Sequence, residues 1–421
     1  NGTWQASGNP ATGANPAADN LAGDYIVACN DGGGNETSGE INFGQRAFKT
    51  AAPTGFSCLC SQNLPDTFGA NSNANEDKNN PSKYFDIKLW TGDGVSPRSF
   101  KNLAFQPDLV WFKQRSDGRD HMLYDAVRGT GADKSLAANN NYAQDQHTTS
   151  QYGYLSAFTS DGFTLTNGSH GSYNDIYTND NGETYVAWCW DAGTSANSSP
   201  GSGGNMTATA QWVNTAAGFS ISKVVKPDGT TNQTFEHGLG VKPLIVLQRR
   251  YDVDEDWYWY TSQVDDSHDF IVLNDDSGKG DTSTTAPTSS VATTMNAAGN
   301  YLVYCWAPVA GFSSFGRFKG NGSTDFNFIH TGFLPKFIII RNSGSNRWVM
   351  LDRERHPLNG TNNGVIWAER YDQESVDTEN NLDYLSNGFS MRCDNGNANG
   401  SGSTYIYAAF AEHPFKTARA S

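Results

Sequence analysis

The chain has 421 residues, which is long enough for two to four domains that each bury a core. It contains 44 Gly, 11 Trp, 18 Tyr and 23 Phe, and only 17% of its residues are charged, a composition typical of short strands and tight turns rather than helices. The formal net charge of −15 repels phosphate backbones and anionic membrane surfaces, and no apolar run approaches the roughly 20 residues of a membrane helix. We therefore expect neither nucleic acid nor a membrane as a partner.

Residues 1–50 predict a module of their own, followed by an Asn-rich connector over 51–80. Strand-like segments at Gly23–Ala28 and Ile41–Phe48 flank a glycine-rich turn, which is the pattern of a hairpin. Two strands alone are marginally stable in water, so this hairpin needs partner strands upstream or on another chain. The chain opens in a polar segment without an initiator Met, and we expect residues upstream of it.

Three copies of one pattern follow the connector. Each copy begins with an apolar run introduced by proline and ends with an aromatic run, and continuous apolar runs predict strands that are buried on both faces. The proline runs are Pro107–Phe112, Pro243–Leu247 and Pro335–Ile340, and the aromatic runs are Tyr185–Trp190, Tyr301–Trp306 and Tyr405–Phe410. The pattern predicts an all-β fold of tandem, jelly-roll-like β-sandwich repeats with long polar loops, at 81–195, 218–310 and 311–421, with a Ser/Gly/Asn-rich linker at 196–217.

The repeat alignment also predicts roles for cysteines and ion pairs. It makes Cys189 equivalent to Cys305 and to Ala409, and a position that tolerates Ala is neither a metal ligand nor a nucleophile. We expect all six cysteines to be reduced and unbridged. Acidic and basic residues recur three apart, at 125 and 128 in the first copy and at 352 and 355 in the third, which favours structural ion pairs over a reactive site.

The N-terminal half resembles a known group of proteins. Asn1–Pro10 and Asn42–Phe48 resemble the last third of a SPRY-type β-sandwich found in marine phage and cyanophage structural proteins, and Phe105–Trp111 matches the module that follows it there. The resemblance covers residues 1 to about 195. It implies a virion protein of the tail-fibre or appendage type, assembled in the host cytoplasm, and it supplies no catalytic residues. Most strands of the SPRY part are missing, so its usual ligand-facing surface is not assumed.

One strand offers a candidate binding surface. Trp257, Tyr258, Trp259 and Tyr260 alternate, so both Trp side chains lie on one face and both Tyr side chains on the other. One face should be core, and the other either a subunit interface or an exposed platform for sugar rings.

Motifs for metal ions and catalysis are weak. The eight histidines show no ligand spacing and are expected in turns and on the surface. The acidic stretch 252–256 lacks the glycine of a calcium loop, so a structural Ca²⁺ is possible but cannot be assigned, and we expect no cofactor.

The lack of a catalytic motif favours a non-enzymatic protein, and the resemblance implies a virion structural protein that contributes to particle architecture and host attachment. The alternative is a capsid-decorating or carbohydrate-binding receptor-binding module that contacts host surface polysaccharide. A glycan depolymerase is a third possibility, although no nucleophile elbow or other catalytic motif is found. Because the hairpin and the aromatic strands carry more apolar area than one sandwich buries, we expect a homo-oligomer, and the resemblance to fibre proteins favours a trimer.

Overall fold

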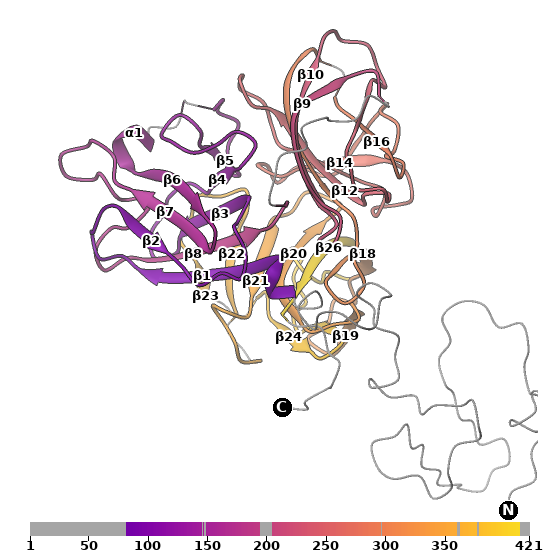
Figure 1. Cartoon of the computed structure of the whole chain (residues 1–421). Coiled ribbons are helices and arrows are strands. Elements are labelled where there is room, and N and C mark those ends of the chain that lie inside the picture. Colours follow the sequence, from indigo (N-terminus) through magenta and orange to yellow (C-terminus); the bar gives the residue numbers. More distant parts are fainter. Residues whose placement is uncertain are drawn as a thin grey trace, which may run out of the picture. The chain divides into compact units, whose positions relative to one another are not determined.

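The computed structural model describes residues 81–412, without 145, 147–148, 194–203, 296, 360–362 and 377–378. These residues lie in one compact unit that spans 73–414 (Figure 1). The predicted SPRY-like module and hairpin at 1–50 and the connector at 51–80 lie outside the described residues, as do Cys29, Cys58 and Cys60.

The all-β prediction is confirmed. Apart from a 3-10 turn at Pro81–Lys83 and the single-turn helix α1 at Thr149–Tyr152, every described element is a β-strand, and the strands pair antiparallel. In the described part of the chain, no helix is long and apolar enough to cross a membrane.

Repeat 1 is a five-stranded sheet with a three-stranded sheet packed on it. The large sheet has the order β1-β8-β3-β4-β5, and the small sheet has the order β2-β7-β6. The strands are β1 (Phe85–Thr91), β2 (Arg98–Phe100), β3 (Leu109–Gln114), β4 (Met122–Asp125), β5 (Leu136–Ala137), β6 (Tyr154–Thr159), β7 (Gly162–Thr166) and β8 (Thr184–Trp190).

Repeat 2 extends the same arrangement at both edges of its large sheet. The large sheet has the order β15-β14-β13-β12-β17-β10-β9, and β11 pairs with β16. The strands are β9 (Thr207–Asn214), β10 (Phe219–Lys226), β11 (Thr234–Glu236), β12 (Ile245–Arg250), β13 (Tyr258–Thr261), β14 (Asp269–Val272), β15 (Gly280–Asp281), β16 (Val291–Thr293) and β17 (Gly299–Trp306).

Repeat 3 has a six-stranded and a three-stranded sheet. Their orders are β18-β26-β20-β21-β22-β23 and β19-β25-β24. The strands are β18 (Ser313–Lys319), β19 (Asn327–His330), β20 (Pro335–Asn342), β21 (Trp348–Asp352), β22 (Gly364–Trp367), β23 (Ser375–Val376), β24 (Leu382–Leu385), β25 (Gly388–Met391) and β26 (Thr404–Ala411).

Strand pairing makes the three repeats equivalent residue by residue. In each large sheet, the strand of the proline run lies between the strand of the aromatic run and the next strand along the chain. These strands are β3 between β8 and β4, β12 between β17 and β13, and β20 between β26 and β21. Val110 pairs with Cys189, Val246 with Cys305 and Ile338 with Ala409. The predicted equivalence of Cys189, Cys305 and Ala409 is therefore confirmed.

The linker expected at 196–217 is wrong in its second half. Thr207–Asn214 forms β9, an additional edge strand that pairs along its length with β10. The segment begins with alternating Thr and Ala, and its two large apolar residues, Trp212 and Val213, are adjacent, so they gave no alternating apolar signal. Its ladder partner β10 determines that it forms a strand.

Both faces of each large sheet are buried, as the continuous apolar runs predicted. In repeat 1, Val110 and Phe112 point into the core between its two sheets. Leu109 and Trp111 point to the opposite face and are also buried. That opposite face is covered by the other two repeats of the same chain.

Candidate functional site

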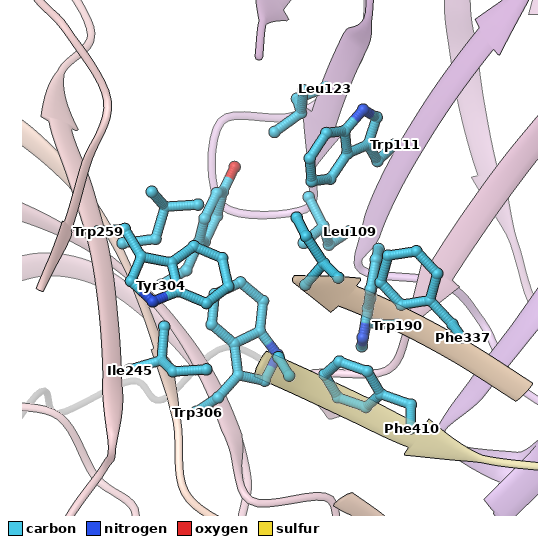
Figure 2. Close-up of a pocket in the computed structure, with 13 residues that line it drawn as sticks. Leu109, Trp111, Leu123, Trp190, Ile245, Trp259, Tyr304, Trp306, Phe337 and Phe410 are labelled. Atoms are coloured by element: carbon cyan, nitrogen blue, oxygen red, sulfur yellow. The ribbon is translucent and has the colours of Figure 1, made fainter. Parts of the chain in front are cut away.

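The three large sheets meet around a common centre. An apolar cavity of ≈ 30 Å³ lies there, and equivalent positions of all three repeats line it (Figure 2). One such set is Leu109, Ile245 and Phe337, and a second is Trp190, Trp306 and Phe410. The repeats are therefore related by an internal pseudo-threefold axis. A cavity of this size and lining has room for about one water molecule and no substrate.

A first set of polar contacts runs around this axis from repeat to repeat. Tyr304 of repeat 2 donates its hydroxyl to Asp125 Oδ2 of repeat 1 at 3.0 Å. Trp188 of repeat 1, at the equivalent position, donates Nε1–H to Asp352 Oδ2 of repeat 3 at 3.1 Å. The third copy of this donor position is Ala408, which has no group to donate.

Each of these carboxylates also holds an arginine of its own repeat. Arg128 Nε donates to Asp125 Oδ2 at 2.6 Å, and Arg355 Nε donates to Asp352 Oδ2 at 2.5 Å. All four side chains are buried. The recurring pairs are structural ion pairs, as predicted, and each one also accepts a hydrogen bond from the neighbouring repeat.

In a second set of contacts, a Trp side chain again donates a hydrogen bond to the preceding repeat. Trp257 of repeat 2 donates Nε1–H to the carbonyl oxygen of Ala137 in repeat 1 at 2.7 Å, and Trp348 of repeat 3 donates to that of Val272 in repeat 2 at 2.8 Å. The equivalent residue of repeat 1 is His121. Contacts thus run from repeat 2 to 1, from 3 to 2 and from 1 to 3, which closes a ring of head-to-tail interfaces.

His121 occupies its interface differently. Its Nδ1 accepts a hydrogen bond from Trp111 Nε1 at 2.9 Å, so Nε2 carries the proton and faces repeat 3, where backbone oxygens of Trp367 and Arg370 lie nearby. Burial lowers the pKa of His121 well below its usual value. A neutral ring therefore replaces the indole found at this position in the other two repeats.

Three buried cations form the third equivalent set. Arg249 Nη2 donates to the carbonyl oxygens of Asn141 and Tyr142 in repeat 1, both at 2.9 Å, and its guanidinium lies 5.2 Å from the centre of the Trp257 ring. Arg341 donates to the carbonyl oxygen of Ser277 in repeat 2. Burial lowers the pKa of each arginine to about 10, a value at which both remain charged near neutral pH.

Lys113 is the repeat 1 member of this set. It donates to carbonyl oxygens of its own repeat, at Gln114 and, at 3.1 Å, at Asp117. Burial lowers the pKa of Lys113 to about 7, and nearby carboxylates, first Asp120, only partly oppose this. At this one position, repeat 1 therefore has a more weakly basic group than Arg249 and Arg341 provide in the other two repeats.

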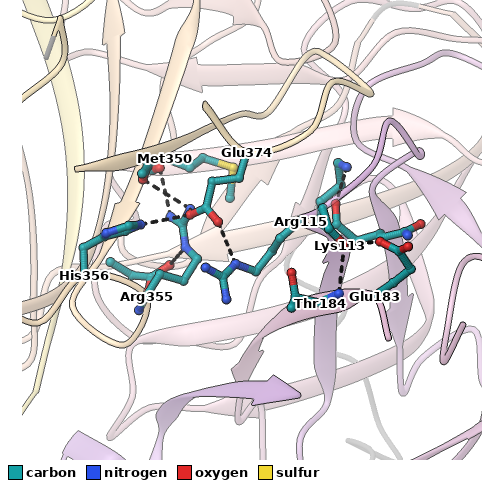
Figure 3. A network of polar contacts seen from close by, with 12 residues as sticks. Lys113, Arg115, Glu183, Thr184, Met350, Arg355, His356 and Glu374 are labelled. Atoms are coloured by element: carbon teal, nitrogen blue, oxygen red, sulfur yellow. Dashed lines mark hydrogen bonds and ion pairs between the residues drawn. The ribbon is translucent and has the colours of Figure 1, made fainter. Parts of the chain in front are cut away.

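A charged network adds to the interface between repeats 1 and 3 (Figure 3). Glu374 lies between Arg355 Nη1 at 2.7 Å, His356 Nε2 at 3.1 Å and Arg115 Nε of repeat 1 at 2.7 Å. Burial raises the pKa of the Glu374 carboxyl, but the neighbouring cations, Arg355 foremost, outweigh it and lower this pKa to about 2. The carboxylate is ionised and fully engaged by cations, which is unsuited to proton transfer.

Residues 80–414 match the family described as "Domain of unknown function (DUF7483)". The chain belongs to this family. The DUF7483 region includes all three repeats, so the family corresponds to the closed triplet rather than to a single sandwich. No curated protein matches the chain.

The aromatic strand at 257–260 does not form the exposed platform that was predicted as one possibility. Trp257 and Trp259 are buried against the neighbouring repeats, and the Trp259 ring lies 5.0 Å from that of Trp348. Tyr260 packs in the core of repeat 2, and Tyr258 packs against it. The alternation was read correctly, but the face that could have been open is an interface within the chain.

The expected surface position of the histidines is wrong for two of them, because His121 and His237 are fully buried. Among the described cysteines, Cys189 and Cys305 are unbridged, as predicted, and these two and Cys393 are buried. Within the described part of the chain, no group of three or more His, Cys, Asp and Glu side chains could hold a metal ion.

One larger hollow lies between repeats 2 and 3. A groove of ≈ 550 Å³ runs between residues 264–266 and β18. Its rim charges are already paired, Asp266 with Arg317 at 2.9 Å and Asp265 with Lys279 at 2.8 Å. The groove is open and polar, but nothing in it resembles a catalytic pair.

The sequence missed the interface donors and one exposed feature. Interface partners such as Trp188 and Asp352 are 164 residues apart and carry no local signal. Phe326 and Phe328 of repeat 3 are exposed, and aligning them with the other repeats would have revealed them as unusual.

Proposed function

We propose that this chain is a non-enzymatic structural subunit of a phage virion, of the tail-fibre or appendage type. In this proposal the DUF7483 triplet is a rigid body that presents polar loops and surfaces outward for attachment. The observation that carries it is the ring of contacts described above, in which the conspicuous buried charges and aromatic side chains join one repeat to the next.

The distribution of chemical groups supports a scaffold rather than an enzyme. The recurring carboxylates Asp125 and Asp352 are held by arginine and by a donor from the next repeat, and Glu374 is held by three basic side chains. Catalytic groups need access to a substrate and a pKa matched to the reaction. These carboxylates have no access to a substrate, because they are buried inside interfaces.

The assignment to a virion rests on the resemblance of residues 1 to about 195 to marine phage structural proteins. The test is immunogold electron microscopy with antibodies against residues 81–412 on purified particles of the phage that encodes the chain. Gold on a fibre or head appendage is the expected result. Purified particles whose proteome lacks the chain would refute the assignment.

The non-enzymatic part has its own test. The full chain is incubated with envelope polysaccharide of the host, and released reducing ends are measured against a heat-unfolded sample. We expect no release. Release above the control would instead support the glycan depolymerase alternative.

We also propose that whole chains associate into a homotrimer, on the basis of the resemblance to fibre proteins. The apolar area of Trp257 and Trp259, which suggested contacts between subunits, is buried within the chain. Light scattering on the full chain tests it, with a trimer as the expected result.

A further inference from the structure

Repeat 3 carries an exposed pair of aromatic rings on its small sheet. Phe326 is 57% exposed and Phe328, two residues later in β19, is 38% exposed. The rings are nearly parallel, with an angle of 6° between their planes and centres 5.8 Å apart. The Phe328 ring extends over Gly388 of the neighbouring strand β25, since a Cβ atom at that glycine would lie 2.9 Å from its edge. The two rings form one continuous apolar surface at the edge of the sheet.

The fold does not require these rings, because the other repeats do without them. Ile329 of repeat 3 occupies the core position of Phe100 in repeat 1 and Phe235 in repeat 2. The residue before it is Phe328 in repeat 3, but Ser99 and Thr234 in repeats 1 and 2.

The hydroxyl-bearing versions are satisfied within their own repeats. Ser99 Oγ lies 2.9 Å from Thr164 Oγ1 across the pair of strands, and Thr234 Oγ1 donates to Asn205 Oδ1 at 2.9 Å. A polar surface is thus the ordinary state of this sheet face, and the phenyl rings are a specific addition of repeat 3.

Polar groups lie on the same face beside the rings. Phe328 pairs with Ser390 and Ser390 with Asp383, so Phe328 and Asp383 share one row across the sheet. Arg392 follows Ser390 by two residues and therefore points to the same side. Arg392 Nε lies 3.5 Å from Asp383 Oδ2, and both side chains are partly exposed. An apolar ring surface is thus bordered by a carboxylate and a guanidinium that can bind neighbouring hydroxyl groups.

We propose that this surface, formed by Phe326, Phe328, Asp383 and Arg392, is a binding site for a pyranose glycan. Ring faces carry partial negative charge and attract the C–H groups on the apolar face of a sugar, while Asp383 and Arg392 accept from and donate to its equatorial hydroxyls.

The exposed area favours a sugar over a second protein. A Phe side chain of roughly 200 Å², exposed to the extents given above, leaves about 200 Å² of aromatic surface in the pair. A stable protein interface needs roughly 800 Å² from each partner. The surface suits a ligand one or two sugar residues long, and the site does not depend on whether the chain belongs to a virion.

The test uses the full chain on an array of neutral gluco- and galacto-configured oligosaccharides, followed by calorimetric titration with the oligosaccharide that gives the strongest array signal. We expect Phe328→Ser, which copies repeat 1, to weaken binding at least tenfold, and Asp383→Asn to weaken it severalfold. Phe328→Tyr keeps the ring and should retain binding. The matched control is Tyr173→Ala, because Tyr173 is an aromatic residue of repeat 1 that is 58% exposed and should not affect binding.

Three results would overturn the proposal. One is no binding to any oligosaccharide by the full chain, and another is equal binding by Phe328→Ser and the unchanged chain. The third is self-association, seen by light scattering, that Phe328→Ser abolishes while glycan binding is absent, which would identify a second copy as the occupant. Thermal unfolding of each variant checks folding, and Phe328→Tyr with Asp383→Asn keep the test decisive if the Ser variant unfolds.

Discussion

Replacing Tyr304 by Phe is the most direct test of the ring of interfaces. The substitution removes a single hydroxyl and keeps the aromatic ring, which stacks on Trp257 with 5.9 Å between ring centres. The lost group is the donor that joins repeat 2 to Asp125 of repeat 1 at 3.0 Å. Burial, followed by the charge of Asp125, raises the pKa of Tyr304 well above its usual value, so the hydroxyl is a donor at every accessible pH.

The expected loss is about 1.5–3 kcal/mol in the free energy of unfolding, the range for hydrogen bonds to an ionised partner. Both residues are essentially fully buried, so water cannot replace the hydroxyl without a rearrangement. Asp125 keeps its bond to Arg128, which limits the loss. Removal of Asp125 itself would leave the Arg128 charge unpaired and should cost about 3–5 kcal/mol.

Urea denaturation followed by tryptophan fluorescence measures the change. Tyr407→Phe is the matched control, because its hydroxyl lies 3.2 Å from Ser314 Oγ, a neutral partner within repeat 3, and its loss should cost about 0.5–1.5 kcal/mol. A Tyr304→Phe loss no larger than that of Tyr407→Phe would refute the claim that this contact stabilises the interface. A double-mutant cycle with Asp125→Asn should show coupling above about 0.5 kcal/mol.

Further predictions concern pH, thiols and association. Asp108 is buried just before β3, and burial followed by the charge of the neighbouring Asp191 raises its pKa to about 8 from the usual 3.8. The folded state therefore keeps a proton on Asp108 that the unfolded state releases. Stability should fall as pH rises through this range, and Asp108→Asn should flatten that slope in urea midpoints. Glu374 has the opposite sign, because its pKa of about 2 gives stability that is present above 4.5 and lost at lower pH. Glu374→Gln should lower the free energy of unfolding at pH 7 by about 2–3 kcal/mol, and an unchanged pH profile in calorimetry would contradict this. The three described thiols should react with iodoacetamide only after unfolding, since all are buried; rapid labelling of the folded chain would be inconsistent with the structure. A chain of residues 81–412 should be monomeric in light scattering, because its apolar sheet faces cover one another, and a trimer would show that they do not.

Features encoded within one repeat could be predicted from the sequence. The proline-led runs gave the central strand of each large sheet, and the alignment of Cys189 with Cys305 and Ala409 is the one seen in the strand pairing. The ion pairs at 125 and 352 were also recognised as structural, because acidic and basic residues three apart recurred in two copies. Local spacing is sufficient for such features.

Features that depend on contacts between repeats could not be predicted. Continuous apolar strands indicate burial on both faces but not which surface covers the second face. Trp257 and Trp259 therefore suggested an exposed platform, whereas the neighbouring repeats bury them. The exposed Phe328 was missed for the opposite reason, since an aromatic residue in a strand usually indicates core, and only its comparison with Ser99 and Thr234 shows that the position faces solvent.

Covalent linkage decides how the three interfaces respond to dilution and to mutation. In an assembly of three identical chains, subunits separate at low concentration and each substitution appears in every interface. Here the partners share one chain at a fixed effective concentration, so Trp188 and Asp352 remain together at any dilution. Repeat 3 can therefore have Ala408 at the position where repeats 1 and 2 have the donors Trp188 and Tyr304, and the hydrogen bonds of those two donors are kept. The same independence allows repeat 3 to expose Phe326 and Phe328 while the other two repeats keep polar faces. A chain with one exposed apolar patch is less prone to aggregation than a chain with three.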